Sequence, residues 1–339
     1  MTAAGSLAGT VQTPEIDLST ARVYAIPMVE RFRGITLREG VVFQGPVGWG
    51  EFCPFEEYDD RTAAGWLATA VEAAYVGWPA PVRDRVEVNA TVPAVGPGRA
   101  AEIVAASGCR TAKVKVAEHP GSLDEDVARV AAVRAALGPA GAVRVDANGR
   151  WDVEVAVRSL TALDDAAAGL EYAEQPCATV EELALVRARV RVPIAADESI
   201  RRAEDPMRVA VTGAADVAVL KCTPLGGVRR SLAVAAQVGT AAGLACVVSS
   251  ALETSVGMSA QLALAGALPD LTLACGLGTA SLLAGDLVGG APGPVGGYRQ
   301  VPTAPPTPDP GLLDRWSHPD PARTRWWLDR LVRAQALLG

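Results

Sequence analysis

The stretch "VRVDANGRW" (residues 143–151) begins like a buried strand and ends in a cluster of polar side chains. Its valines suit the interior of a sheet, whereas Asp146 and Asn148 follow at once and Gly149 then allows a turn. Taken alone, such an ending could be a helix cap or an Asx-turn, because Asp and Asn serve in both. Its meaning therefore depends on whether other strands of the chain end in the same way.

A short β-branched run followed by a helical segment recurs along the chain from about residue 86. Segments rich in Ala, Leu and Arg, such as "DEDVARVAAVRAAL" and "VEELALVRARV", separate most of the runs. This alternation is typical of parallel βα units, and eight units over about 200 residues fit a (β/α)8 barrel better than an open sheet. The predicted strands are residues 86–91, 111–116, 142–147, 170–175, 192–198, 216–221, 244–250 and 271–276.

The segments on either side of this repeat have a different character. Residues 21–85 predict antiparallel strands joined by Gly/Pro turns and then a helix, which makes an α+β region before the barrel. A Pro/Gly-rich stretch after the barrel leads to a terminal helix that we expect to pack back on the α+β region. We therefore predict a flexible tail (1–20), an α+β domain (21–85), the barrel (86–288) and a C-terminal extension (289–339).

Composition and charge argue against several classes of function. A net charge of -7 gives no reason to expect nucleic acid or a membrane as a partner. The six cysteines are scattered without a CxxC pair and there are two histidines, so a Cys/His zinc site is poorly supported. The N-terminal segment lacks a basic n-region and a sustained apolar h-region, and no apolar run free of charges reaches the roughly 20 residues of a spanning helix. We expect a cytoplasmic protein, and the sequence indicates no particular oligomeric state.

Charged side chains gather at the predicted strand ends, where the active site of such a barrel lies. Asp146, Glu174 and Asp197 end three successive strands, and Lys115 and Lys221 end the strands on either side. Each is about one βα unit from the next, so the five should lie around one mouth. One such acid could cap a helix or form a salt bridge, but three facing one point would repel unless a cation lay among them. All-oxygen ligands favour Mg²⁺, for which Mn²⁺ can substitute.

The lysines indicate the chemistry. A lysine near a divalent cation and other ammonium groups has a lowered pKa, so it can act as a base near neutrality. Lys113 shares a strand face with Lys115 and could lower the pKa of Lys115 further or pair with an acid. A metal beside two such bases indicates removal of a proton from the carbon next to a carboxylate. The other polar candidates at the strand ends are Asn148, Glu198, Ser249 and Ser250.

The motifs "TAKVKV", "VDANGRW", "EQPC", "AADES" and "VLKC", in this order and spacing, resemble the enolase superfamily in its muconate-lactonising subgroup. The resemblance extends from about residue 22 to 287 and implies that the α+β domain caps the barrel mouth. It also implies that Asp146, Glu174 and Asp197 bind Mg²⁺. Lys115 would abstract the proton, and Lys221 would face the other side of the substrate as a cation.

Finer motifs favour one kind of member. "GITLREGVVFQGPVGWGEFCPFEEY" in the cap, "SSALETSVG" after the seventh strand and "GLGT" at the eighth resemble the lyases of menaquinone biosynthesis that dehydrate a cyclic carboxylate. The implied partner is this small carboxylate, whose hydroxyl would leave with the help of Lys115. Its succinyl side would meet Ser249, Ser250, Gly276, Thr279 and the cap loop around Arg31 and Arg33.

Two alternatives remain open. An N-acylamino acid racemase would use the same metal, with Lys115 and Lys221 as opposed acid and base. Relatives that epimerise dipeptides usually carry an acidic DxD-type motif at the eighth strand, where this chain has Gly-Leu-Gly-Thr. A non-catalytic barrel that binds an anion as a scaffold is the alternative from another class, and the intact set of acids and lysines argues against it.

Overall fold

A parallel sheet forms the centre of the protein, whose computed structural model describes residues 14–32, 34–201, 207–290 and 293–338. Its strands follow one another in sequence order and each pairs in parallel with the next. Buried Val, Ala, Ile and Leu side chains fill most of this sheet, as expected where both faces are covered. The strands are β5 (Ala90–Val92), β6 (Thr111–Lys115), β7 (Ala142–Asp146), β8 (Tyr172–Glu174), β9 (Ile194–Ala196), β10 (Val217–Leu220) and β11 (Ala245–Val248).

Cys275 and Gly276 close this sheet into a barrel. Cys275 bridges in parallel to Val88 before β5, and Gly276 bridges to Ser249 after β11. The backbone N–H of Cys275 donates to the carbonyl of Glu87 at 2.7 Å, and the N–H of Gly276 donates to Val248 at 2.8 Å. The predicted (β/α)8-type barrel is therefore confirmed.

The first and eighth predicted strands are shorter than expected. Of residues 271–276 only Cys275 and Gly276 form bridges, because burial of this segment begins at Ala274. Residues 86–91 fall into β4 (Arg85–Glu87) and β5, because β4 pairs antiparallel with β12 (Tyr298–Gln300) of the C-terminal extension while β5 pairs with β6.

Helices surround the barrel, and their sequences show why they begin where they do. In α4, Asp152 is the N-cap and accepts the N–H of Val155 at 2.8 Å. The helix then buries Ala156, Leu160 and Leu163, which recur at helical spacing on one face. No helix in the described part of the chain is long and apolar enough to cross a membrane. The helices are α2 (Pro97–Ser107), α3 (Leu123–Leu137), α4 (Val153–Ala167), α5 (Val180–Arg187), α6 (Glu198–Arg201), α7 (Met207–Val211), α8 (Cys222–Leu225), α9 (Val228–Ala242) and α10 (Ser255–Ala267).

The N-terminal region is an antiparallel sheet with a helix. Its sheet consists of β1 (Arg22–Phe32), β2 (Ile35–Gln44) and β3 (Trp49–Phe52), and it leads to α1 (Asp60–Val71) and a π-helical turn (Glu72–Val76). Ile16 is buried and Leu18–Thr20 form a 3-10 helix, so residues 14–20 belong to this region. Residues 1–13 of the expected tail lie outside the described part.

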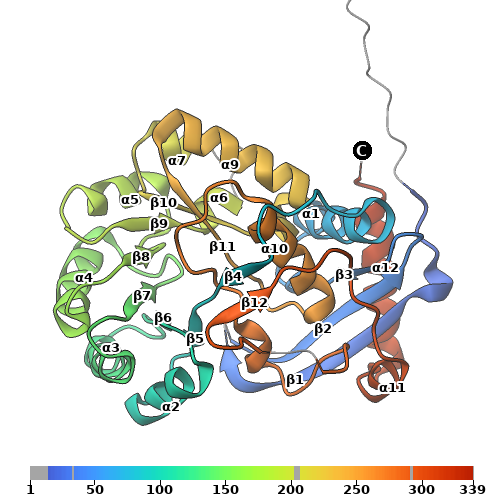
Figure 1. Ribbon diagram of the computed structural model, residues 1–339, viewed down its shortest axis with the longest axis horizontal. Coiled ribbons are helices and arrows are strands. Elements are labelled where there is room, and N and C mark those ends of the chain that lie inside the picture. Colours follow the sequence, from blue (N-terminus) through green and yellow to red (C-terminus); the bar gives the residue numbers. More distant parts are fainter. Residues whose placement is uncertain (1–13, 33, 202–206, 291–292, 339) are drawn as a thin grey trace, which may run out of the picture.

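The C-terminal extension returns to the first region, as Figure 1 shows for the red helix α12 beside the blue strands. After a 3-10 turn (Thr279–Leu282) and β12, the chain forms α11 (Pro310–Arg315) and α12 (Pro321–Gln335). Trp327 of α12 is buried, and its ring meets that of Phe52 edge-on at 6.2 Å. The last helix therefore shares the core of the α+β region.

Candidate active site

The ends of β6 to β10 bring the predicted charged residues together. Lys115, Asp146 and Glu174 are in register on three neighbouring strands, so their side chains occupy one row at the barrel mouth. Asp197 follows β9 directly and Lys221 follows β10 directly. The three carboxylates and the two lysines are almost entirely shielded from solvent.

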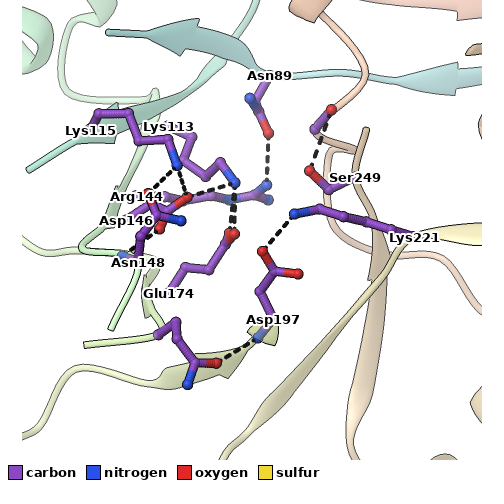
Figure 2. Close-up of polar contacts among 12 residues, drawn as sticks. Asn89, Lys113, Lys115, Arg144, Asp146, Asn148, Glu174, Asp197, Lys221 and Ser249 are labelled. Carbon is purple, nitrogen blue, oxygen red and sulfur yellow. Dashed lines mark hydrogen bonds and ion pairs between the residues drawn. The ribbon is translucent and has the colours of Figure 1, made fainter. Parts of the chain in front are cut away.

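Each carboxylate is paired with a lysine (Figure 2). Lys115 Nζ lies 2.5 Å from Asp146 Oδ2. Lys113 Nζ lies 2.8 Å from both oxygens of Glu174, and Lys221 Nζ lies 2.5 Å from Asp197 Oδ2. Figure 2 shows Lys115 and Lys221 reaching the acids from opposite sides. A substrate between the two lysines would thus meet an amine on each face.

Burial and neighbouring charges give these groups different pKa values. Burial raises the pKa of Glu174 to about 7, with the nearby charges of Asp146 and Asp197 adding to the rise. Burial would also raise the pKa of Asp146, but Lys115 and Lys113 hold it well below its usual range. Burial lowers the pKa of Lys115, and Lys113 lowers it further, whereas Asp146 opposes the change.

The acids suit a hard cation in their chemistry. All three ligating groups would be carboxylates from neighbouring strands, which is the oxygen-only set that Mg²⁺ and Mn²⁺ accept. Burial, together with the charges of Asp146 and Asp197, disfavours the ionised form of Glu174 and so raises its pKa, and a divalent cation beside it would favour the ionised form. No group of three His, Cys, Asp or Glu in the described residues lies in ligating geometry, and each of the three carboxylates is paired with a lysine instead. Asp146, Glu174 and Asp197 are the residues that could hold the ion.

Asn148 supports the site through three hydrogen bonds. Its Oδ1 accepts from Lys115 Nζ at 2.7 Å, and its backbone N–H donates to Asp146 Oδ1 at 3.0 Å. Its Nδ2 donates to Glu198 Oε1 at 3.3 Å. The backbone of Asn148 has a φ of 49°, a left-handed conformation that asparagine tolerates better than most residues. Asn148 therefore fixes Lys115 relative to the acids.

Gln175 is a supporting residue that the strand-end pattern did not indicate. Its Oε1 accepts the backbone N–H of Asp197 at 3.0 Å, and its Nε2 donates to Ser199 Oγ at 2.8 Å. It is fully buried and directly follows Glu174. It thereby ties the loop after β8 to the loop that carries Asp197.

A pocket lined by residues of both the barrel and the α+β region lies over these groups. Ser250 Oγ and Thr279 Oγ1 are 2.6 Å apart in its wall. A Cβ on Gly276 would lie 2.5 Å from Ser249 Oγ, so glycine at this position leaves room for the Ser249 side chain. The predicted residues in the lining are Lys113, Lys115, Asp146, Asn148, Lys221, Ser249, Ser250, Gly276 and Thr279.

Other lining residues were not expected from the sequence. Phe32 and Phe55 come from the α+β region, and Lys115 Nζ lies over the Phe32 ring, 5.2 Å from its centroid. No local signal in the sequence distinguishes them from core aromatics. Thr91 ends the first predicted strand, so the strand-end rule would have found it if applied there. Arg31 lines a wider outer cavity beside the pocket, and Arg33 lies outside the described residues.

Comparison with known proteins agrees with this architecture. Residues 98–312 match a family described as "Enolase C-terminal domain-like", and residues 23–74 match "Enolase N-terminal domain-like". The chain is 63% identical to the o-succinylbenzoate synthase of Thermobifida fusca (strain YX) over 79% of this chain and 83% of that protein. It is 54% identical to the o-succinylbenzoate synthase of Mycolicibacterium smegmatis over 96% of this chain and 98% of that protein. The muconate lactonizing enzyme from Pseudomonas putida has the same fold, with a TM-score of 0.72, 24% identity and coverage of 90% and 99% of the two chains.

Proposed function

The chain belongs to the enolase superfamily, and from this premise we propose that it acts as an o-succinylbenzoate synthase. This lyase removes water from 2-succinyl-6-hydroxy-2,4-cyclohexadiene-1-carboxylate and yields 2-succinylbenzoate in menaquinone biosynthesis. The observation that carries the proposal is 54% sequence identity, over nearly the full length of both chains, to a protein of this name. In this chain the two lysines also approach the acids from opposite sides. A cytoplasmic location is part of the proposal, supported by six free cysteines. The division into a cap (21–85, on which residues 14–20 pack), a barrel (86–288) and an extension (289–339) is also part of the proposal.

Asp146, Glu174 and Asp197 would hold a divalent cation, most suitably Mg²⁺. When bound, the ion supplies positive charge that stabilises the enolate formed when the proton leaves. If Asp146 binds the ion, Lys115 Nζ loses its hydrogen bond to Asp146. It can then bond to Asn148 Oδ1 and to the substrate. The residues of this chain then carry out the proton transfers.

Lys115 is the base in this proposal, since burial and Lys113 lower its pKa and favour the neutral amine. Its Nζ takes the proton from the carbon next to the ring carboxylate, and the electron pair of this C–H bond passes into the enolate. When the hydroxyl leaves, this pair forms the new double bond of the aromatic ring. The C–O bond on the same face then breaks, and the proton on Lys115 leaves with the hydroxyl as water. Lys221 remains an ammonium group on the opposite face, where it attracts the π electrons of the intermediate.

The succinyl side of the substrate is assigned to the wall formed after β11 and at the eighth barrel position. Ser249, Ser250 and Thr279 offer hydroxyls there, and Gly276 leaves room beside Ser249. This wall therefore presents hydroxyl groups, not the acidic side chains that would hold an ammonium group. They suit a carboxylate or ketone oxygen.

The function is tested by mixing the purified chain with the cyclohexadiene substrate and Mg²⁺ and following the formation of 2-succinylbenzoate. Excess chelator should abolish turnover, and Mg²⁺ or Mn²⁺ should restore it. Glu174→Gln should lose most of its Mg²⁺ affinity in calorimetry, because an amide is a far weaker ligand. Glu154→Gln, at an exposed ion pair with Arg189, is the matched control and should bind Mg²⁺ normally.

Two results would count against the proposal. Full activity in excess chelator would remove the metal from the mechanism. If the wild-type chain forms no 2-succinylbenzoate, the proposed function is wrong.

Racemisation of N-succinylamino acids is the second candidate, favoured by the position of Lys115 and Lys221 on opposite sides of the acids. Such a reaction needs a proton to be removed on one face and returned on the other. Both activities are measured with the same enzyme preparation. A kcat/KM for racemisation above that for dehydration would make racemisation the main activity.

A further inference from the structure

Thr91 places an unpaired hydroxyl next to the site. Its Oγ1 is buried and has no hydrogen-bond partner among the residues that the structure describes, and the residue as a whole is 5% exposed. A buried hydroxyl without a partner is unfavourable, whereas valine has nearly the same shape and carries no such cost. Its neighbours Ala90 and Val92 show that β5 otherwise uses apolar residues. The described part of the fold thus provides no hydrogen bond for this hydroxyl.

The strand register directs Thr91 into the barrel. Thr91 pairs with Lys113 on β6, and Lys113 pairs with Arg144 on β7. Residues paired in a parallel sheet point to the same side, and the side chains of Lys113 and Arg144 point inward (Figure 2). Thr91 therefore lies beside Lys113, and it lines the same pocket as Lys115 and Asp146.

Thr91 also borders a neighbouring cavity, whose charged groups satisfy one another. Arg99 in that cavity lies 3.1 Å from Glu102 and 3.2 Å from Glu30. These pairs leave little demand for a further hydrogen bond from Thr91. The pocket over the acids, which Thr91 also lines, is therefore the side from which we expect its partner.

The chemistry of the pocket indicates what that partner is. The groups of the lining that can donate a hydrogen bond are the amines of Lys113, Lys115 and Lys221 and the hydroxyls of Ser249, Ser250 and Thr279. A pocket with so many donors suits an anionic oxygen. We infer that the Thr91 hydroxyl donates a hydrogen bond to a carboxylate oxygen of the bound substrate, and so completes its pairing only in the complex. The identity of that substrate rests on the proposed function.

The test compares Thr91→Val, which removes the hydroxyl and keeps the shape, with Thr91→Ser, which keeps the hydroxyl. Thermal unfolding is measured without ligand, and binding of 2-succinylbenzoate is measured by calorimetry with saturating Mg²⁺. Thr91→Val should unfold at the same or a higher temperature and bind the product about tenfold more weakly, as for the loss of a hydrogen bond to a charged group. Thr91→Ser should bind within about threefold of wild type, because it can still donate.

Thr223→Val is the matched control. The hydroxyl of Thr223 is also buried, but it donates to Glu253 at 3.0 Å and accepts from Gln261 at 3.2 Å, away from the pocket. This variant should lose stability and bind the product normally, the reverse of Thr91→Val. The contrast separates a hydroxyl used by the fold from one used by the ligand.

Three outcomes would overturn the inference: wild-type product affinity in Thr91→Val, a loss of stability like that of Thr223→Val, or a tenfold loss of Mg²⁺ affinity without product. The last would show that the hydroxyl serves the metal. If the wild-type chain does not bind the product, the proposed function fails instead. The stability comparison then still tests whether the hydroxyl is unpaired.

Discussion

Lys113 and Lys115 lie two residues apart on β6, yet their surroundings act on them in opposite directions. Burial would lower the pKa of Lys113, but Glu174 and Asp146 together raise it well above its usual range. For Lys115 burial prevails, and the ammonium group of Lys113 lowers its pKa further. Lys113 therefore stays charged and holds Glu174, which leaves Lys115 as the lysine suited to exchange a proton.

Substitutions of the two opposed lysines should separate their tasks. Lys115→Ala should lower kcat for dehydration by about 10²–10⁴-fold or more, because it removes the proposed general base. Lys221→Arg keeps a cation that can still face the enolate, although the planar guanidinium fits less well. It should therefore retain more dehydration activity than Lys221→Ala, while any racemisation is lost because arginine does not give up its proton. Steady-state rates for both reactions check this, and equal losses in the two Lys221 variants would contradict the role of Lys221 as a cation alone.

At the scale of single residues, the strand-end pattern predicted which side chains gather but not how they pair. Asp146, Glu174 and Asp197 follow from their position after apolar runs about one βα unit apart. Gln175 could not be assigned in this way, because its role depends on Asp197 and Ser199 from the next loop. Phe32 and Phe55 reach the pocket from another domain, so no spacing in the barrel sequence indicates them.

At the scale of elements, Arg38 of β2 links the cap to the loop after β11. Its guanidinium donates to the carbonyls of Leu252 at 2.9 Å, Ala251 at 3.2 Å and Cys53 at 2.5 Å. Ala251 and Leu252 line the pocket, and Leu252 has a φ of 66°, which is strained for leucine. A buried arginine of the cap thus holds a strained loop of the barrel in place.

Loss of this link should weaken both the fold and the binding of substrate. Arg38→Met keeps much of the side-chain volume and removes the donors, so the free energy of unfolding should fall by about 2–4 kcal/mol. The loop should loosen, and KM should rise more than kcat falls. Arg22→Met, at an exposed arginine with local hydrogen bonds, is the control and should change stability by less than about 0.5 kcal/mol. Urea unfolding and steady-state kinetics measure both effects, and an unchanged KM in Arg38→Met would show that the loop keeps its shape without Arg38.

The elements that sequence periodicity predicted best are those with a local cause. α4 has its Asp152 cap and an apolar stripe at helical spacing, both visible in the chain. β12 has no such signal, since it is a three-residue strand in a Pro/Gly-rich stretch and exists because β4 offers it an edge. The division of the first barrel strand into β4 and β5 follows from the same distant pairing.

At the scale of the whole molecule, the end of the chain supports the pocket from behind the cap. Arg330 of α12 is buried and donates to the carbonyls of Phe55 at 2.9 Å and Tyr58 at 2.6 Å. Phe55 lines the pocket, so the last helix fixes one of its walls. The sequence predicted that this helix packs on the first region, but contacts across about 270 residues of chain require the folded structure.

A cluster around Glu39 fastens α12 to the cap and should make this docking depend on pH. Glu39 accepts from Arg323 Nε and Nη2 at 2.9 Å each and from His318 Nε2 at 2.8 Å, and Trp327 Nε1 lies 3.4 Å away. Burial would raise the pKa of Glu39, but the hydrogen bonds and charge of Arg323, with help from His318 and Trp327, lower it. A carboxyl group with a lowered pKa stabilises the fold fully above its ordinary value, and this stabilisation is lost as pH falls through the lower, folded value.

Glu39→Gln should therefore reduce the free energy of unfolding by about 1–3 kcal/mol near pH 7, the range for hydrogen bonds to a charged group. The difference in free energy of unfolding between wild type and variant should stay constant from about pH 7 to about pH 5.5. It should shrink below about pH 4.3, where the carboxyl group takes up a proton in the unfolded chain. Glu56→Gln is the control, because Glu56 also bonds Arg323 but is 69% exposed, and it should change stability by less than about 1 kcal/mol. Urea unfolding followed by tryptophan fluorescence at each pH measures both variants. A deficit that grows in acid would mean that the charge on Glu39 opposes the docking of α12, the reverse of what its lowered pKa requires.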